Sequence, residues 1–126
     1  MLKNLLNNTV YVKITKNQFW ARHIENQKEA VVTAADAFTT KRLLVGEFST
    51  AEKYLKGIMK TLHEEKLFSA SPQVILHPME MVEGGLSEIE ERAMIELAMG
   101  AGARKVLIWL GHELSDQEAL EYVKKG

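Results

Sequence analysis

The side chains best able to bind a metal ion or act as a base at neutral pH are the four histidines, His23, His63, His77 and His112. Their spacing matches no zinc-binding pattern such as H-E-x-x-H, in which two histidines on one helical face share an ion. The chain has no cysteine, which excludes thiolate ligands and disulfide bonds. His112 could act as a base, but a lone histidine is more often structural. We therefore expect no catalytic residue and no metal site.

A glycine pair that could bind an anion, Gly84-Gly85, precedes an expected helix N-terminus. The Lys-Ser/Thr of a phosphate-binding loop is missing, and the nearby Glu80 and Glu83 would repel phosphate. A second glycine-rich stretch, residues 100–102, falls at a helix C-terminus, where the helix dipole is negative and does not favour phosphate. We expect no cofactor and no small-molecule substrate.

Basic and aromatic residues lie close together near the start of the chain. Such residues can neutralise and stack on single-stranded nucleic acid; here they are Lys13, Lys16, Phe19, Trp20 and Arg22. The alternative is an amphipathic hairpin whose aromatic residues enter the core. The net charge of −1 favours this alternative, so we expect no nucleic-acid partner.

The chain of 126 residues is expected to form a single domain over residues 1–126. No apolar run approaches the roughly 20 residues that span a bilayer. Residues 1–8 carry leucines at helical spacing but are too short for a signal peptide, so we expect them to be a frayed tail. A location in the reducing cytoplasm is compatible with the lack of cysteine.

The first third of the sequence predicts a meander of three strands, at residues 10–15, 19–25 and 30–34, separated by polar turns. In the first strand Val10, Val12 and Ile14 alternate with more polar residues, which is typical of a strand with one buried face.

The rest of the sequence predicts helices alternating with buried strands. Three capping-box patterns mark helix starts, at Ser49/Glu52, Ser87/Glu90 and Ser115/Glu118. The expected apolar faces comprise Leu55, Ile58, Met59 and Leu62 in the first helix, Ile89, Ala93 and Leu97 in the second, and Ala119, Leu120 and Val123 in the third. Buried strands are expected at residues 74–76 and 106–110, and Gly100 or Gly102 is expected to end the second helix in a left-handed cap.

The predicted order is therefore β-β-β-α-β-α-β-α. Alternation of strands and helices favours parallel pairing in the later half. We predict an α/β fold with a five-stranded mixed sheet flanked by helices, in which strands one to three are antiparallel and strands four and five are added parallel to the first.

One stretch of the sequence resembles a known family. Residues 86–106, LSEIEERAMIELAMGAGARKV, resemble the MreB-like bacterial actin homologues, in which a Glu- and Arg-rich helix leads through Gly-Ala-Gly-Ala-Arg into a buried strand. The resemblance covers residues 71–106 best, is weaker over 45–63, and corresponds only to the first subdomain of such a protein. It implies a ribonuclease H-like, actin-like core, which agrees with the order predicted from periodicity.

The chain departs from that family where the family handles nucleotide. Where the family has Asp-Leu-Gly-Thr, this chain has residues 13–16, Lys-Ile-Thr-Lys, so the degenerate phosphate-loop positions are Lys13, Thr15 and Lys16. Lysine cannot supply an oxygen ligand for Mg²⁺. Where the family has Glu-Glu-Pro, this chain has Leu110, Gly111 and His112. The resemblance therefore implies descent from an ATPase without its chemistry.

An acidic insertion, residues 77–85, replaces a short turn of the family. Loops carry function more often than cores do, so we identify Met79, Glu80, Met81 and Glu83 as a candidate interaction loop. The alternative is a tolerated insertion without a role.

Taken together, these features favour a non-catalytic, MreB-like protein-interaction module that binds a protein partner or itself. The resemblance adds an expected link to cell shape or the cytoskeleton, and a weak peripheral contact with a membrane through the N-terminus. The alternative function is a nucleotide-binding, actin-like ATPase fragment that a partner chain completes.

Overall fold

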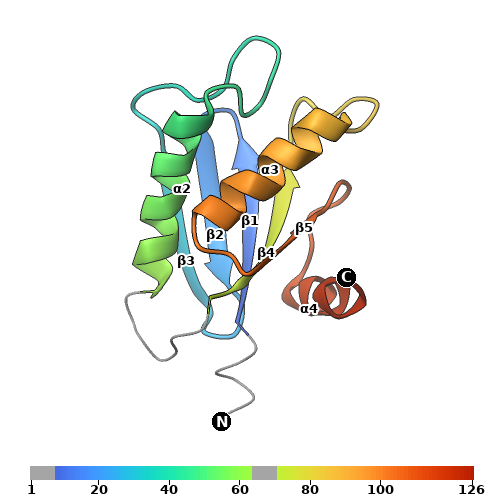
Figure 1. Cartoon of the computed structure of the whole chain (residues 1–126). Helices are drawn as coiled ribbons and strands as arrows, with labels where there is room; N and C mark the ends of the chain where they lie inside the picture. The colour runs from blue at the N-terminus through green and yellow to red at the C-terminus, as the bar shows by residue number, and fades with distance from the viewer. Residues whose placement is uncertain (1–7, 64–70) are drawn as a thin grey trace.

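The structure is a computed structural model that describes residues 8–63 and 71–126 (Figure 1). Its elements follow the predicted order: β1 (Thr9–Thr15), β2 (Gln18–His23), β3 (Lys28–Thr33), α2 (Phe48–His63), β4 (Gln73–Pro78), α3 (Glu88–Gly100), β5 (Lys105–Ile108) and α4 (Asp116–Lys125). The ends of the strands differ from the expected ones by one or two residues.

All five strands form one mixed sheet in the order β3-β2-β1-β4-β5. β2 pairs antiparallel with β1 and β3, through short polar turns, and β4 pairs parallel with β1 and β5. The parallel neighbours β4 and β5 are joined through α3, because a parallel pair needs a crossover connection. The α/β class and the five-stranded mixed sheet flanked by helices are confirmed.

One face of the sheet is covered by α2 and α3 (Figure 1). Alternate residues of β1, namely Val10, Val12 and Ile14, contribute to this core, as the period of a strand requires. The apolar stripe predicted for α2 is confirmed, since all four of its members are buried: Leu55, Ile58, Met59 and Leu62.

The opposite face of the sheet carries a smaller apolar cluster under α4. Tyr11 and Ile75 of the sheet pack there with Leu114, Ala119 and Val123. The expectation that Leu120 also faces the core is wrong, because its side chain is 38% exposed. Ala119 and Val123 are four residues apart and share the buried face, whereas Leu120 is rotated about 100° away from Ala119.

Helix α3 packs with a different face from the one predicted. Leu97 is buried, but Ile89 is 82% exposed and Ala93 is half-buried. The buried residues are Met94, Leu97 and Ala98. In a helix of 3.6 residues per turn, residues four apart are rotated by about 40° relative to each other. Ile89 is two such steps before Leu97 and therefore does not share its core-facing side.

The connection from α3 to β5 contains the predicted left-handed position. α3 ends at Gly100 with Ala101 as its C-cap, and the next residue, Gly102, has φ 113°, so the predicted left-handed conformation is that of Gly102. The following strand, β5, is half-buried and not fully buried as expected, because it is an edge strand paired only with β4.

The expected frayed tail is partly corrected. Asn8 is buried, its carbonyl accepts a hydrogen bond from the Gln73 N–H at 2.8 Å, and its side chain contacts His23. Residues 1–7, with their leucines, lie outside the described residues. Of the helices that the structure describes, none is long and apolar enough to cross a membrane.

Two of the three predicted capping boxes are present, with reciprocal hydrogen bonds at Ser87/Glu90 and Ser115/Glu118. The third is wrong, because α2 begins at Phe48 and the Ala51 N–H donates to the Glu47 carbonyl. Ser49 therefore lies within the first turn of α2 and does not precede it.

This difference predicts unequal effects of two matched substitutions. Ser87→Ala is expected to lower the free energy of unfolding by about 1 kcal/mol, because the Glu90 amide in the first turn of α3 loses the Ser87 hydroxyl that accepts its hydrogen bond. Ser49→Ala is expected to have little effect. Urea unfolding of both variants checks the prediction, and equal losses would contradict it.

Candidate functional site

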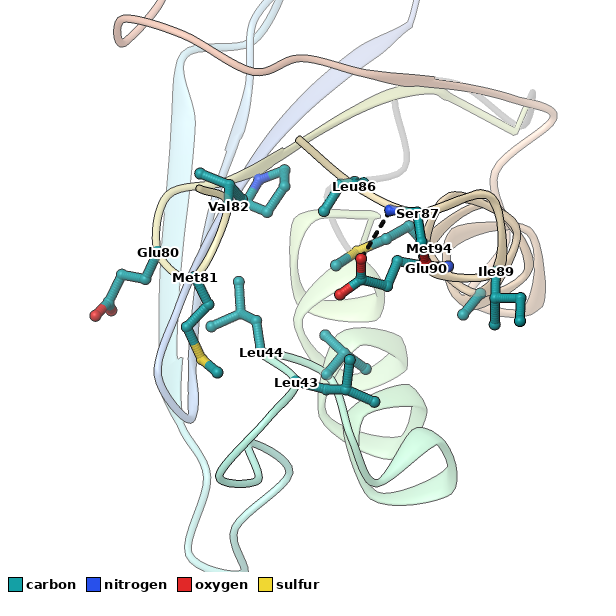
Figure 2. A pocket seen from close by; sticks show the side chains of 13 residues that line it. Leu43, Leu44, Glu80, Met81, Val82, Leu86, Ser87, Ile89, Glu90 and Met94 are labelled. Carbon is teal, nitrogen blue, oxygen red and sulfur yellow. Dashed lines mark hydrogen bonds between the residues drawn. The ribbon is translucent and has the colours of Figure 1, made fainter. Parts of the chain in front are cut away.

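A pocket of about 220 Å³ opens beside the carboxyl-terminal end of β4 (Figure 2). Three segments form it: residues 43–45 of the connection between β3 and α2, the loop of residues 79–85 that follows β4, and the first turns of α3. Its lining is mostly apolar and comprises Leu43, Leu44, Val45, Pro78, Glu80, Met81, Val82, Leu86, Ser87, Ile89, Glu90, Ala93 and Met94.

The 79–85 loop supplies one wall of this pocket. Of the four residues predicted as an interaction loop, Glu80 and Met81 line the pocket, whereas Met79 and Glu83 are exposed and lie outside the lining. Met81 has φ 59°, a left-handed backbone conformation that is uncommon for residues other than glycine. Figure 2 shows the Met81 side chain directed toward Leu44, while the Glu80 carboxylate points away from it.

The degenerate phosphate-loop positions lie at the end of β1, and each is engaged by the chain itself. Lys13 forms an ion pair with Glu113, and its ammonium lies 3.8 Å from the centre of the Trp20 ring. The Thr15 hydroxyl donates to the Gln18 side chain at 3.2 Å. These two side chains therefore do not converge on a common ligand position.

Lys16, the third of these positions, joins the end of β1 to the 79–85 loop. Its backbone N–H donates to the Glu80 carboxylate at 2.9 Å, and its ammonium lies 4.0 Å from the other carboxylate oxygen. A carboxylate of the insertion thus accepts a hydrogen bond from a backbone amide at the end of β1. This amide lies at one of the positions that were compared with the family's phosphate loop.

His77 forms a buried network at the end of β4. The Leu114 N–H donates to the Tyr11 hydroxyl at 3.0 Å, and this hydroxyl lies 2.7 Å from His77 Nδ1. His77 Nε2 lies 3.0 Å from the Gly111 carbonyl oxygen, so Nε2 carries the proton and Nδ1 accepts from Tyr11. Burial lowers the pKa of His77 and raises that of Tyr11, which keeps both groups neutral. The histidine therefore joins β1 and β4 to the segment before α4.

The remaining candidate residues do not form a catalytic group. His112 is exposed and lies 3.2 Å from a Glu118 carboxylate oxygen. Leu110 and Gly111, the other positions compared with the family's Glu-Glu-Pro, offer no ionisable side chain. Within residues 8–63 and 71–126, no group of three or more histidine, aspartate or glutamate side chains could hold a metal ion.

The basic and aromatic residues of the hairpin divide between the two faces of the sheet. Phe19 is fully buried in the larger core, whereas Trp20 is half-buried on the opposite face. Arg22 forms ion pairs with Glu29 and Asp116. The structure therefore has the amphipathic hairpin, which the sequence analysis gave as the alternative to a nucleic-acid-binding surface.

Sequence patterns alone missed residues 43–45, the pocket wall opposite the 79–85 loop. They lie in the long connection between β3 and α2, which has no helical or strand periodicity. The only signal in the sequence was the apolar run Leu43-Leu44-Val45. This run precedes the helix start expected at Ser49 and belonged to no predicted element.

The buried histidines predict a loss of stability in weak acid. Burial holds the pKa of His23 and of His77 below the ordinary value, so the unfolded chain takes up protons at a higher pH than the folded chain. This part of the free energy of unfolding is complete above the unfolded-state pKa of about 6.5 and declines as the pH falls below it. Urea unfolding near pH 7.5 and near pH 5.5 (about one unit on either side of that pKa), followed by tryptophan fluorescence, measures the decline. A flat profile would contradict it, and replacing both histidines with glutamine is expected to flatten it.

Comparison with known proteins adds the following similarities. Over 101 residues the chain is 34% identical to the uncharacterized protein YjaA of Escherichia coli, an alignment that covers 76% of this chain and 78% of that protein. Over 65 residues, 52% of this chain, it is 34% identical to the cell shape-determining protein MreB of Pasteurella multocida and of Escherichia coli, but it spans only 17% and 18% of their lengths. No protein-family model matches the sequence.

Among solved structures, the PPX-GPPA enzyme of Aquifex aeolicus aligns with a TM-score of 0.45 and 15% sequence identity, over 82% of this chain and 36% of that one. The MreB similarity is confined to about half of the chain, whereas the similarity to YjaA extends over most of both proteins. This chain therefore belongs to the same protein family as YjaA of Escherichia coli.

Proposed function

We propose that this chain is a non-catalytic protein-interaction module on a ribonuclease H-like, actin-like core. Two independent features support the core assignment. A meander of three antiparallel strands is extended by parallel strands on the far side of β1, which is the arrangement that the resemblance implies. Half of the chain is also similar in sequence to MreB.

The observation that carries the proposal is the contact between Lys16 and Glu80. A phosphate-binding loop needs backbone amides that are free to approach the anion. Here the Lys16 amide at the end of β1 already donates to the Glu80 carboxylate. A nucleotide phosphate at this position would have to displace a carboxylate and would then lie beside its negative charge.

The same loop that covers the strand end also builds the apolar pocket. Glu80 is tied to Lys16, while Met81 and Val82 line the pocket with Leu43 and Leu44. An apolar, concave surface formed by loops favours contact with another protein chain. We propose a protein partner or self-association in the cytoplasm. A link to cell shape rests on the partial similarity to MreB.

Calorimetric titration with Mg-ATP tests the absence of nucleotide binding. We expect no saturable heat for the wild type, nor for Glu80→Gln, because removing one charge does not restore the missing Asp and Gly of the phosphate loop. Saturable binding by the wild type would instead favour the alternative function, an ATPase fragment that a second chain completes.

Affinity capture followed by mass spectrometry tests the interaction role. We expect a cytoskeletal or envelope-associated protein, or further copies of this chain, to be recovered in proportion to the bait. Val82→Asp, which puts a charge into the pocket, is expected to reduce recovery, whereas Val31→Asp on the exposed part of β3 serves as the control. Failure to recover any partner with the wild type would contradict the proposal.

A further inference from the structure

The size of the pocket indicates what it can hold. Its volume of about 220 Å³ is below the roughly 300–1,000 Å³ of small-molecule sites but is sufficient for one large aliphatic side chain. The two carboxylates of its lining are already hydrogen-bonded, Glu80 to Lys16 and Glu90 to the Ser87 backbone. The pocket therefore favours an apolar group over a polar metabolite.

A side chain of this kind stands at the rim of the same pocket. Ile89, in the first turn of α3, is 82% exposed, the largest exposed fraction of the large apolar side chains in the described part of the chain. Leu43 lines the pocket on the opposite side and is 38% exposed. The surface thus presents both a cavity and an aliphatic side chain next to it (Figure 2).

The two sides of the pocket differ in charge. Residues 83–92 contain four glutamates and one arginine, and the exposed members include Glu83, Glu88 and Glu91. The opposite side begins with Lys41 and Arg42, both exposed and adjacent in sequence to Leu43. In a two-fold arrangement the same patch lies on both partners, so the acidic side of one copy can meet the basic side of the other at two equivalent places.

We propose that the occupant of this pocket is a second copy of this chain, and that the protein forms a two-fold homodimer in which Ile89 of each copy enters the pocket of the other. The inference rests on the proposed role as an interaction module and names its partner. It accounts together for the exposed isoleucine, the apolar cavity beside it and the opposite charges of its two sides.

Sedimentation velocity over a wide range of concentrations tests the dimer. We expect the wild type to dimerise and Ile89→Glu to remain monomeric, because a carboxylate cannot enter the apolar cavity without losing its hydration. Ile95→Glu is the matched control, since Ile95 is exposed on the same helix but lies outside the pocket lining. Circular dichroism and urea unfolding establish that each variant is folded.

A charge exchange tests the paired sides directly. Glu88→Lys/Glu91→Lys makes the acidic side basic, and Lys41→Glu/Arg42→Glu makes the basic side acidic, so each variant alone is expected to lose the dimer through repulsion. An equimolar mixture is expected to restore a dimer that contains one copy of each, because both contacts are then between opposite charges.

A monomeric wild type, a dimeric Ile89→Glu or a mixture that stays monomeric would overturn the homodimer. If the chain is monomeric but captures another protein in a way that Val82→Asp abolishes, the interaction role remains and only the identity of the occupant is wrong. If it neither dimerises nor captures a partner, both proposals fail.

Discussion

Replacing Phe38 with alanine is expected to lower the free energy of unfolding by about 3–5 kcal/mol. Phe38 is fully buried, and its ring stacks on that of Phe19 with 4.8 Å between centroids and 18° between planes. Truncation would remove this contact and leave a cavity between the sheet and the connection to α2. Urea unfolding followed by circular dichroism measures the loss.

The effect should extend to the pocket, because Phe38 anchors the connection that carries Leu43 and Leu44. The Asn17 side chain accepts hydrogen bonds from the Phe38 and Thr39 amides at 2.9 and 2.8 Å, and the Phe38 carbonyl accepts from the Gly46 amide at 2.9 Å. Phe38→Leu keeps most of the apolar volume and is expected to cost clearly less. A loss below about 0.5 kcal/mol for the alanine variant, the range of an ordinary surface substitution, would contradict the anchoring role.

The sheet could be predicted because its signals are local. In β1 the apolar residues Val10, Val12 and Ile14 alternate with other residues and share one face, and the turn at Lys16 and Asn17 separates the strand from β2. The caps of α3 and α4 were also predictable, since a serine followed three residues later by a glutamate satisfies two amides within one turn. Such patterns need no knowledge of distant parts of the chain.

The predictions failed where neighbouring elements decide the outcome. Ser49 and Glu52 have the same spacing as a capping box, yet α2 starts one residue before Ser49, and Phe48 packs against the larger core. Ile89 fits an apolar stripe of period four, but the face of α3 that packs into the larger core carries Met94, Leu97 and Ala98. Helix patterns indicate that an apolar face exists, and the packing selects which one is used.

The candidate site was only half predictable for a similar reason. The 79–85 loop stood out as an acidic insertion, but its contact with Lys16 and with residues 43–45 depends on three segments meeting at one end of the sheet. Residues that are far apart in sequence and lack periodicity carry no pattern that indicates such a meeting. At Lys13, Thr15 and Lys16 the sequence indicated only that the Asp and Gly of a phosphate loop are missing. The structure adds that the Glu80 carboxylate accepts a hydrogen bond from the Lys16 amide.

The buried network of His77 leads to the second large effect. Tyr11→Phe is expected to lower the free energy of unfolding by about 2–4 kcal/mol, because it leaves two buried groups without a partner, the His77 Nδ1 acceptor and the Leu114 amide. Tyr122→Phe is the matched control: its hydroxyl donates to the Ile108 carbonyl from a half-buried position, so we expect a loss of about 1 kcal/mol.

A second measurement separates the network from simple packing. In Tyr11→Phe, His77 Nδ1 loses the hydroxyl that donates to it and becomes the site at which a proton can bind. Protonation of the folded state then costs less, so the decline of stability in weak acid should become shallower than in the wild type. An unchanged pH profile together with a loss no larger than that of Tyr122→Phe would show that the hydroxyl supports neither His77 nor the Leu114 amide in the segment before α4.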